Sequence, residues 1–126
     1  MTQYTRDKQR KLVELLYKKT LERRIKWGIN EDRQIFATIA GRLLFVYSAV
    51  NGEGEDIVHF VLFGANEKTS DAFSDESIRF DNVVPEVFEN WYLLCSALLD
   101  MGTRQASGSD DVLDAMIDEL DDDVPF

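Results

Sequence analysis

Two apolar stretches in the middle of the chain limit its fold more than any other feature. Residues 34–50 read QIFATIAGRLLFVYSAV, which is rich in β-branched and aromatic residues but interrupted at Ala40-Gly41, so it predicts two strands joined by a tight turn. After the loop NGEGED, residues 57–63 (IVHFVLF) are apolar at both alternating sets of positions, which predicts a central strand covered on most of both faces. We expect an antiparallel sheet of three or four strands, ending in a short edge strand at 77–83 (SIRFDNV) after a polar, turn-rich segment.

Helical periodicity flanks the predicted sheet on both sides. Over about residues 5–27, apolar residues recur at helical spacings, which predicts an amphipathic helix that stops at Gly28. A second core helix is predicted to begin at Pro85, because proline suits the first helical turn. Its apolar positions are Val87, Phe88, Trp91, Leu94, Cys95, Leu98 and Leu99. After a loose segment, RQASGSDD, Ser109 is the expected N-cap of a short amphipathic helix that ends at about Leu120.

The length of the chain sets the domain organisation. With 126 residues, 44% of them hydrophobic, it is long enough for one compact domain and too short for two. We expect a single α+β domain over residues 1–106, the amphipathic helix at 107–120 after a loose linker, and a flexible acidic recognition tip at 121–126. The sequence has no apolar run of about eighteen residues and no secretory signal, so we expect a cytoplasmic chain with no membrane contact. Self-association stays open.

The formal net charge of −10 is unevenly distributed along the chain. Residues 1–27 contain nine basic and three acidic residues, a local balance of +6, so the other 99 residues carry −16. A globally acidic surface repels phosphate backbones, but a basic helix can still contact nucleic acid locally. The candidate nucleic-acid contacts are Lys18, Lys19, Arg23 and Arg24. The alternative is a solvated basic face, which can face the acidic C-terminal segment of the same chain.

The residue types that most enzymes use for catalysis are scarce. The chain has one histidine, His59, in a predicted strand, and one cysteine, Cys95, in the apolar run WYLLCSALL. Neither has partners at metal-ligand spacing, so a structural histidine and a small buried hydrophobe are the simpler interpretations. Phosphate-loop, dinucleotide, zinc-protease and nucleophile-elbow motifs are absent from the sequence. We therefore predict a non-enzymatic protein with no catalytic residue, no metal and no cofactor.

The sequence closes with DDDVPF, which offers a receptor several distinct handles. The α-carboxylate of Phe126 can pair with Arg or Lys, its ring can enter an apolar pocket, and the three aspartates can lie along a basic ridge. Pro125 and the β-branched Val124 reduce the backbone freedom that docking removes. This segment is predicted to be a peptide ligand for a basic, apolar pocket, with the candidate contacts Asp121, Asp122, Asp123, Val124, Pro125 and Phe126.

These six residues resemble the acidic tip of bacterial single-stranded-DNA-binding proteins, which typically reads Asp-Asp-Asp-Ile-Pro-Phe; here Val124 replaces the isoleucine. In that family the tip recruits replication, recombination and repair proteins and does not hold DNA. The resemblance implies that Pro125 and Phe126 are the anchors, that the aspartates steer, and that the partners are genome-maintenance proteins. The remaining 120 residues lack the family's five-stranded barrel and long linker, and resemble small uncharacterised bacterial and phage α+β proteins, which implies no activity.

Three functional hypotheses follow from these observations. The first is an interaction module that docks through the tip on genome-maintenance proteins. The second is a single-stranded-DNA-binding protein on a non-barrel fold, in which the basic N-terminal helix and sheet aromatics hold the DNA. The third is an acidic inhibitor or immunity-type protein that covers a basic site on its target.

Overall fold

The computed structural model describes residues 2–64, 68–79, 81–85 and 87–122. Its elements are α1 (Gln3–Leu21), β1 (Gly28–Ile29), β2 (Ile35–Ile39), β3 (Arg42–Val50), β4 (Asp56–Phe63), β5 (Thr69–Ser74), α2 (Trp91–Ser107) and α3 (Ser109–Asp122). The strands form one antiparallel sheet in chain order, β1-β2-β3-β4-β5. The predicted α+β fold, with a helix before the sheet and helices after it, is confirmed, although the sheet has five strands and not three or four.

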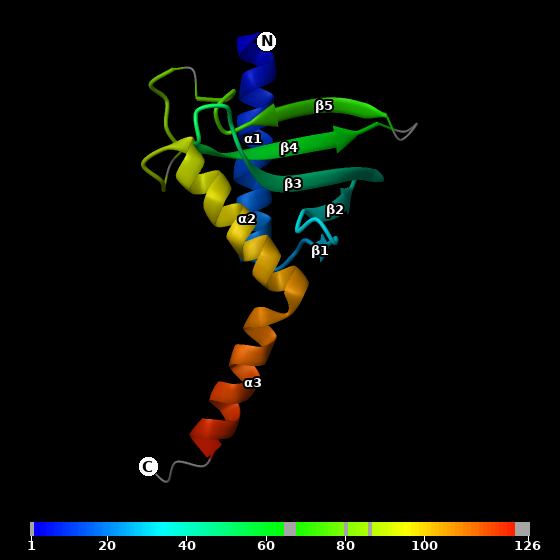
Figure 1. Cartoon of the computed structure of the whole chain (residues 1–126), viewed down its shortest axis with the longest axis vertical. Coiled ribbons are helices and arrows are strands. Elements are labelled where there is room, and N and C mark those ends of the chain that lie inside the picture. Colours follow the sequence, from blue (N-terminus) through cyan, green and yellow to red (C-terminus); the bar gives the residue numbers. More distant parts are fainter. Residues whose placement is uncertain (1, 65–67, 80, 86, 123–126) are drawn as a thin grey trace.

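The two long helices cover one face of the sheet. Figure 1 shows α1 running behind the strands, and α2 packs against α1. Alternate residues of β3, Leu44 and Val46, are buried in the same core as Val13 of α1 and Leu98 of α2. Because side chains alternate along a strand, the residues between them, such as Phe45, point to the opposite face. The protein is therefore a two-layer structure with one open sheet face.

The predicted hairpin in residues 34–50 is confirmed. Ile39 pairs with Arg42, so only Ala40 and Gly41 form the turn. Both have a positive φ, of 54° and 71°, which suits the two-residue turns whose twist matches that of the strands. This turn sets the register of β2 against β3, which directs Ile35 and Ala37 into the core.

The later strands match the prediction in part. β4 lies inside the sheet between β3 and β5, as predicted, but only Ile57, Val58 and Phe60 of its residues are buried, so it is not covered on most of both faces. The edge strand is β5, within the segment expected to be a loop, and residues 77–79 and 81–83 contain no strand. Phe73 explains the difference, because its ring stacks on Phe60 at a centroid distance of 4.9 Å and attaches this polar segment to β4.

Three helix boundaries also differ from the prediction. α1 ends at Leu21, six residues before Trp27, because Arg23 adopts a left-handed φ of 58°. α2 does not begin at Pro85 but at Trp91, where the side chain of Asn90 accepts a hydrogen bond from the backbone of Leu93 at 2.8 Å. The expected linker is helical on both sides of Gly108, and Ser109 is the first residue of α3.

A close contact joins the C-terminal ends of the two long helices. Gly102 of α2 is buried, and a Cβ atom there would lie 2.4 Å from Cδ1 of Ile35, so only glycine allows α2 this close to the sheet. The indole of Trp27 packs beside it and donates a hydrogen bond to Oγ1 of Thr20 at 2.9 Å. Gln105 donates to the carbonyl oxygen of Thr20 at 2.8 Å. These contacts fix the place from which α3 starts.

A buried arginine holds the segment before α2. Arg10 of α1 is only 6% exposed, and its Nε donates to the carbonyl of Ile78 at 2.6 Å. Its two terminal nitrogens donate to the carboxylate of Asp81 at 2.9 and 3.1 Å, and its guanidinium lies over the ring of Trp91. The hydrogen bonds from Arg10 lower the pKa of Asp81 below its usual value. This arrangement supplies the charged partner that a buried guanidinium needs.

Replacing Thr20 by valine is expected to lower the free energy of unfolding by about 1–3 kcal/mol, because the buried indole N–H of Trp27 loses its acceptor while the volume hardly changes. Urea titration followed by circular dichroism measures the difference. Thr38→Val, on an exposed site of β2, is the matched control. Equal stability of the two variants would show that the hydrogen bond does not matter to the fold.

Candidate functional site

The helix α3 projects from the folded body. Figure 1 shows it leaving the far end of α2 and extending away from the sheet. All of its 14 residues are described, and none is buried. Its attachment is confined to its first turn, where Arg104 of α2 pairs with Asp110 at 2.8 Å and Arg23 pairs with Asp111 at 3.7 Å. The rest of the helix is therefore open to a partner.

The two sides of α3 have opposite character. Its apolar side is exposed: the exposed fractions are 54% for Val112, 48% for Leu113, 58% for Met116, 53% for Ile117 and 65% for Leu120. The remaining positions carry seven carboxylates and no basic residue. Asp110 and Asp111 lie in the first turn, where the positive end of the helix dipole stabilises their negative charges. A partner for this helix must offer both apolar area and positive charge.

The predicted recognition tip is described only at its beginning. Asp121 and Asp122 are exposed and belong to the last turn of α3, so they are helical and not part of a flexible tip. The other four predicted contacts, Asp123, Val124, Pro125 and Phe126, lie outside the described residues. The end of α3 thus carries the first two aspartates of the DDDVPF segment into solvent.

The four candidate nucleic-acid contacts lie at and just beyond the end of α1. Lys18 is exposed, and Lys19 pairs with Glu22 at 3.6 Å. Arg23 pairs with an aspartate of α3, and Arg24 is exposed in the turn that follows α1. One of the four is therefore directed to the chain's own acidic segment, as the alternative interpretation of the basic helix expects.

An aromatic cluster occupies the open face of the sheet. Tyr47 stacks on His59 at a centroid distance of 5.1 Å, and Phe45 contacts Phe36 at 5.8 Å and Phe63 at 5.6 Å. The core residues of these strands face α1, so the aromatic cluster and the basic helix are on opposite sides of the sheet. The second hypothesis expected aromatic residues on the sheet but did not name them, although the alternation of aromatic and aliphatic residues in β3 contains the signal.

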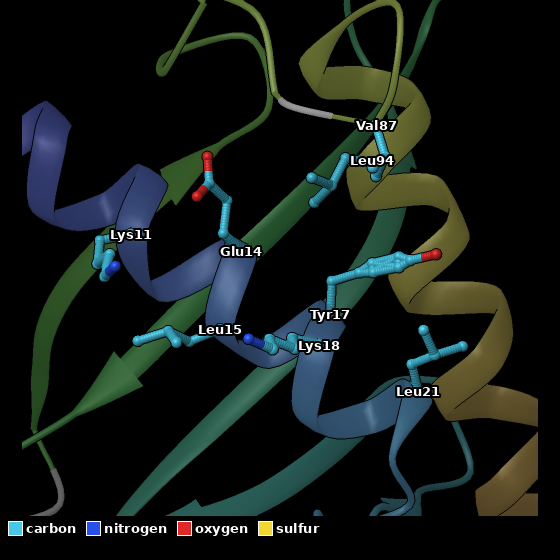
Figure 2. Close-up of a pocket in the computed structure, with 8 residues that line it drawn as sticks. All are labelled: Lys11, Glu14, Leu15, Tyr17, Lys18, Leu21, Val87 and Leu94. Carbon is cyan, nitrogen blue, oxygen red and sulfur yellow. The ribbon is translucent and has the colours of Figure 1, made fainter.

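A groove between α1 and α2 is a feature that sequence reasoning missed. Figure 2 shows Tyr17 reaching from α1 toward α2 and Leu94 pointing from α2 toward α1. The groove has a volume of about 530 Å³. Its lining consists of Lys11, Glu14, Leu15, Tyr17, Lys18, Leu21, Val87 and Leu94. It combines exposed aliphatic side chains with two lysines, which is the character that α3 requires of a partner.

Two buried groups inside the fold have shifted pKa values. Burial raises the pKa of the Cys95 thiol, which keeps it neutral and a poor nucleophile. Asp75 is 0% exposed, and its Oδ1 accepts a hydrogen bond from the backbone of Val58 at 2.7 Å. Its Oδ2 has no hydrogen-bond partner among the described residues, and burial raises the pKa of this carboxyl. Both side chains are buried, so neither Cys95 nor Asp75 forms a site that a ligand can reach.

Neither a metal site among the described residues nor a relative defines the chemistry of this chain. Within the described ranges, no group of three or more His, Cys, Asp or Glu residues is arranged to hold a metal ion, and no helix is long and apolar enough to cross a membrane. Comparison with known proteins found no family model, no curated protein and no solved structure that matches the chain. The function therefore has to be inferred from the exposed features of the chain itself.

The substitution Asp75→Asn is expected to make the protein progressively more stable than wild type as the pH rises. The folded-state pKa of Asp75 is raised above its ordinary value of 3.8. The contribution of this carboxyl to the free energy of unfolding is therefore fully present below pH 3.8 and is lost as the pH rises through the raised pKa. Asparagine does not titrate, so the variant keeps its stability. Urea titrations across this range measure the difference, with the exposed Asp56→Asn as the control for losing one carboxylate. A difference that does not change with pH would contradict this account of Asp75.

Proposed function

We propose that this chain is a non-enzymatic protein-interaction module that docks through residues 121–126 on proteins of DNA replication, recombination or repair. The observation that carries the proposal is the sequence DDDVPF, which begins in the last turn of a helix that extends away from the folded body (Figure 1). A docking peptide works best when its own domain does not cover it. The helix α3, in which the segment begins, has no buried residue and so meets this requirement.

The chemistry of the segment supports capture by a basic, apolar pocket. The phenyl ring of Phe126 supplies apolar area, and the terminal α-carboxylate that the resemblance implies beside it can accept paired hydrogen bonds from an arginine. Pro125 has a fixed φ, so less conformational entropy is lost on docking. The aspartates before them attract a positively charged receptor over a distance and favour fast association.

The helix α3 supports the proposal as a charged spacer. Its 14 residues span about 21 Å at 1.5 Å per residue. A receptor of ordinary size can therefore approach the end of α3 without touching the sheet. The seven carboxylates along the helix extend the negative field of the tip back toward the body.

The surroundings of the single cysteine and the single histidine support a function other than catalysis. The Cys95 thiol is buried, and His59 stacks on Tyr47 in the open sheet face. Neither residue lies beside a described group that would activate it as a nucleophile or general base. The hypothesis of single-stranded-DNA binding and that of an acidic inhibitor stay predictions. The first is weakened by the separation of the aromatic cluster from the basic helix.

Removal of Phe126 from the full chain is expected to abolish the capture of genome-maintenance proteins from a bacterial lysate while leaving the fold unchanged. The ring and the adjacent carboxylate are the proposed anchors, so a loss of at least tenfold in retained partner is expected for about 1.4 kcal/mol or more of lost binding energy. Immobilised intact and shortened chains are compared by mass spectrometry of the retained proteins. Partners of the intact chain should also be released by a free DDDVPF peptide.

Two further variants make this test specific. Adding one glycine after Phe126 keeps the ring but moves the α-carboxylate, and should reduce capture as strongly as removing the ring. Val50→Ala, at an exposed site of β3, removes apolar area elsewhere and should capture normally. Retention of the same helicases, nucleases or recombination proteins by all four chains would overturn the proposed function.

A further inference from the structure

The helix α3 lacks the interactions that normally keep a short helix folded. A helix of 14 residues is marginal in water, and α3 has no buried residue to compensate. Carboxylates four residues apart repel along its length, at Asp110, Asp114, Asp118 and Asp122. Its last turn is acidic and has no basic residue, which is unfavourable at the negative end of the helix dipole. A positively charged, apolar surface would relieve each of these costs.

The groove between α1 and α2 is such a surface. Leu15 is 42% exposed and Leu21 is 61% exposed, and both lie on α1 within the groove lining. Lys18 lies one turn from each of these leucines and Lys11 lies one turn from Leu15, and Figure 2 shows the four side chains along one edge of the groove. The stretch of α1 from Lys11 to Leu21 is about 15 Å long, which fits within the length of α3.

The α3 helix of the same chain cannot occupy this groove. Two antiparallel helices need a connection of about two to five residues, whereas only Gly108 separates α2 from α3. The ion pairs of Arg104 with Asp110 and of Arg23 with Asp111 hold the first turn of α3 in its extended direction. The groove is lined by residues 11–21 of α1 and by Leu94 near the start of α2, whereas α3 leaves the opposite end of α2. The docked helix must therefore come from another molecule.

Pairing of α3 with α3 of a second copy is opposed by charge. Each helix carries seven carboxylates and no basic side chain, so a coiled coil of two such helices would bring fourteen negative charges together. The groove instead has Lys11 and Lys18 against the single acid Glu14. Opposite charges therefore favour the pairing of α3 with the groove over the pairing of α3 with itself.

We infer that α3 of one copy docks its apolar side in the α1–α2 groove of a second copy. The exposed side formed by Val112, Leu113, Met116, Ile117 and Leu120 covers Leu15 and Leu21 of the partner, and Lys11 and Lys18 of the partner face the flanking carboxylates of α3. Because each copy has one helix and one groove, mutual exchange closes a two-fold dimer. This dimer does not depend on residues 124–126, so it stands or falls separately from the proposed function.

A pair of charge-reversed variants tests the docking. Lys11→Glu/Lys18→Glu makes the groove acidic, and Asp114→Lys/Glu119→Lys makes α3 less acidic while leaving its ion-paired first turn intact. Each variant alone should lose the dimer: Lys11→Glu/Lys18→Glu sets an acidic groove against the acidic α3, and Asp114→Lys/Glu119→Lys sets two introduced lysines of α3 against Lys11 and Lys18. Mixed together they should form a heterodimer, since one contact then joins an unchanged helix to an unchanged groove, and the other sets the introduced lysines of α3 against the introduced glutamates of the groove. Light scattering after size-exclusion chromatography measures the mass, starting from 14.5 kDa for one chain.

Three controls separate the inference from its alternatives. Lys26→Glu/Lys68→Glu changes the net charge equally at exposed sites outside the groove and should stay dimeric. A chain without residues 124–126 should also stay dimeric. Thermal unfolding shows that each variant is folded. A monomeric wild type, a dimer that survives Lys11→Glu/Lys18→Glu, or a mixture that stays monomeric would each overturn the inference.

Discussion

The apolar layer between one face of the sheet and the helices α1 and α2 is the constraint on which the rest of this structure depends. Near the C-terminal ends of the two helices, Gly102 allows α2 to pack closely against Ile35. Trp27 packs beside Gly102 and donates a hydrogen bond to Thr20 of α1. The end of α2 is thereby fixed beside the end of α1. One glycine later α3 begins, so its direction is set by the packing of the core and by the arginines at its first turn. The exposure of α3 is a consequence of how this layer ends.

The described part of the molecule carries three apolar surfaces that are at least partly exposed. These are the aromatic cluster on the open sheet face, the groove between α1 and α2, and the apolar side of α3. Contiguous apolar surface is uncommon on monomeric proteins and marks interaction sites. The three surfaces differ in charge: the groove is flanked by lysines and α3 by carboxylates, whereas the aromatic cluster is formed by uncharged side chains and His59. Charge therefore separates the groove and α3 as a complementary pair.

The sequence predicted those parts of the fold that depend on local pattern. The β2–β3 hairpin was predictable because its turn and its apolar alternation lie within 17 residues. β5 was not, since TSDAFS has a single large apolar side chain, Phe73, and becomes a strand only by pairing with β4. The helix α2 begins at Trp91 and not at the predicted Pro85, because the side chain of Asn90 caps the helix there. The apolar side of α3 was visible as a periodicity, but a periodicity does not say whether the side is covered by its own domain.

The first and last helices carry opposite charges, which favour contact between them. The basic α1 and the acidic α3 lie in one chain, yet the single residue between α2 and α3 keeps most of their charges apart. A chain that carries two complementary surfaces which cannot meet within one molecule satisfies both by association. In a dimer formed by that exchange, each molecule would still carry one DDDVPF segment, which begins in the last turn of its docked helix. Two such segments on one particle raise the effective concentration of the second after the first has bound, so weak docking by each becomes stronger capture by the pair. The proposed self-association through α3 and the proposed recruitment through residues 121–126 would therefore be compatible uses of the same acidic end of the chain.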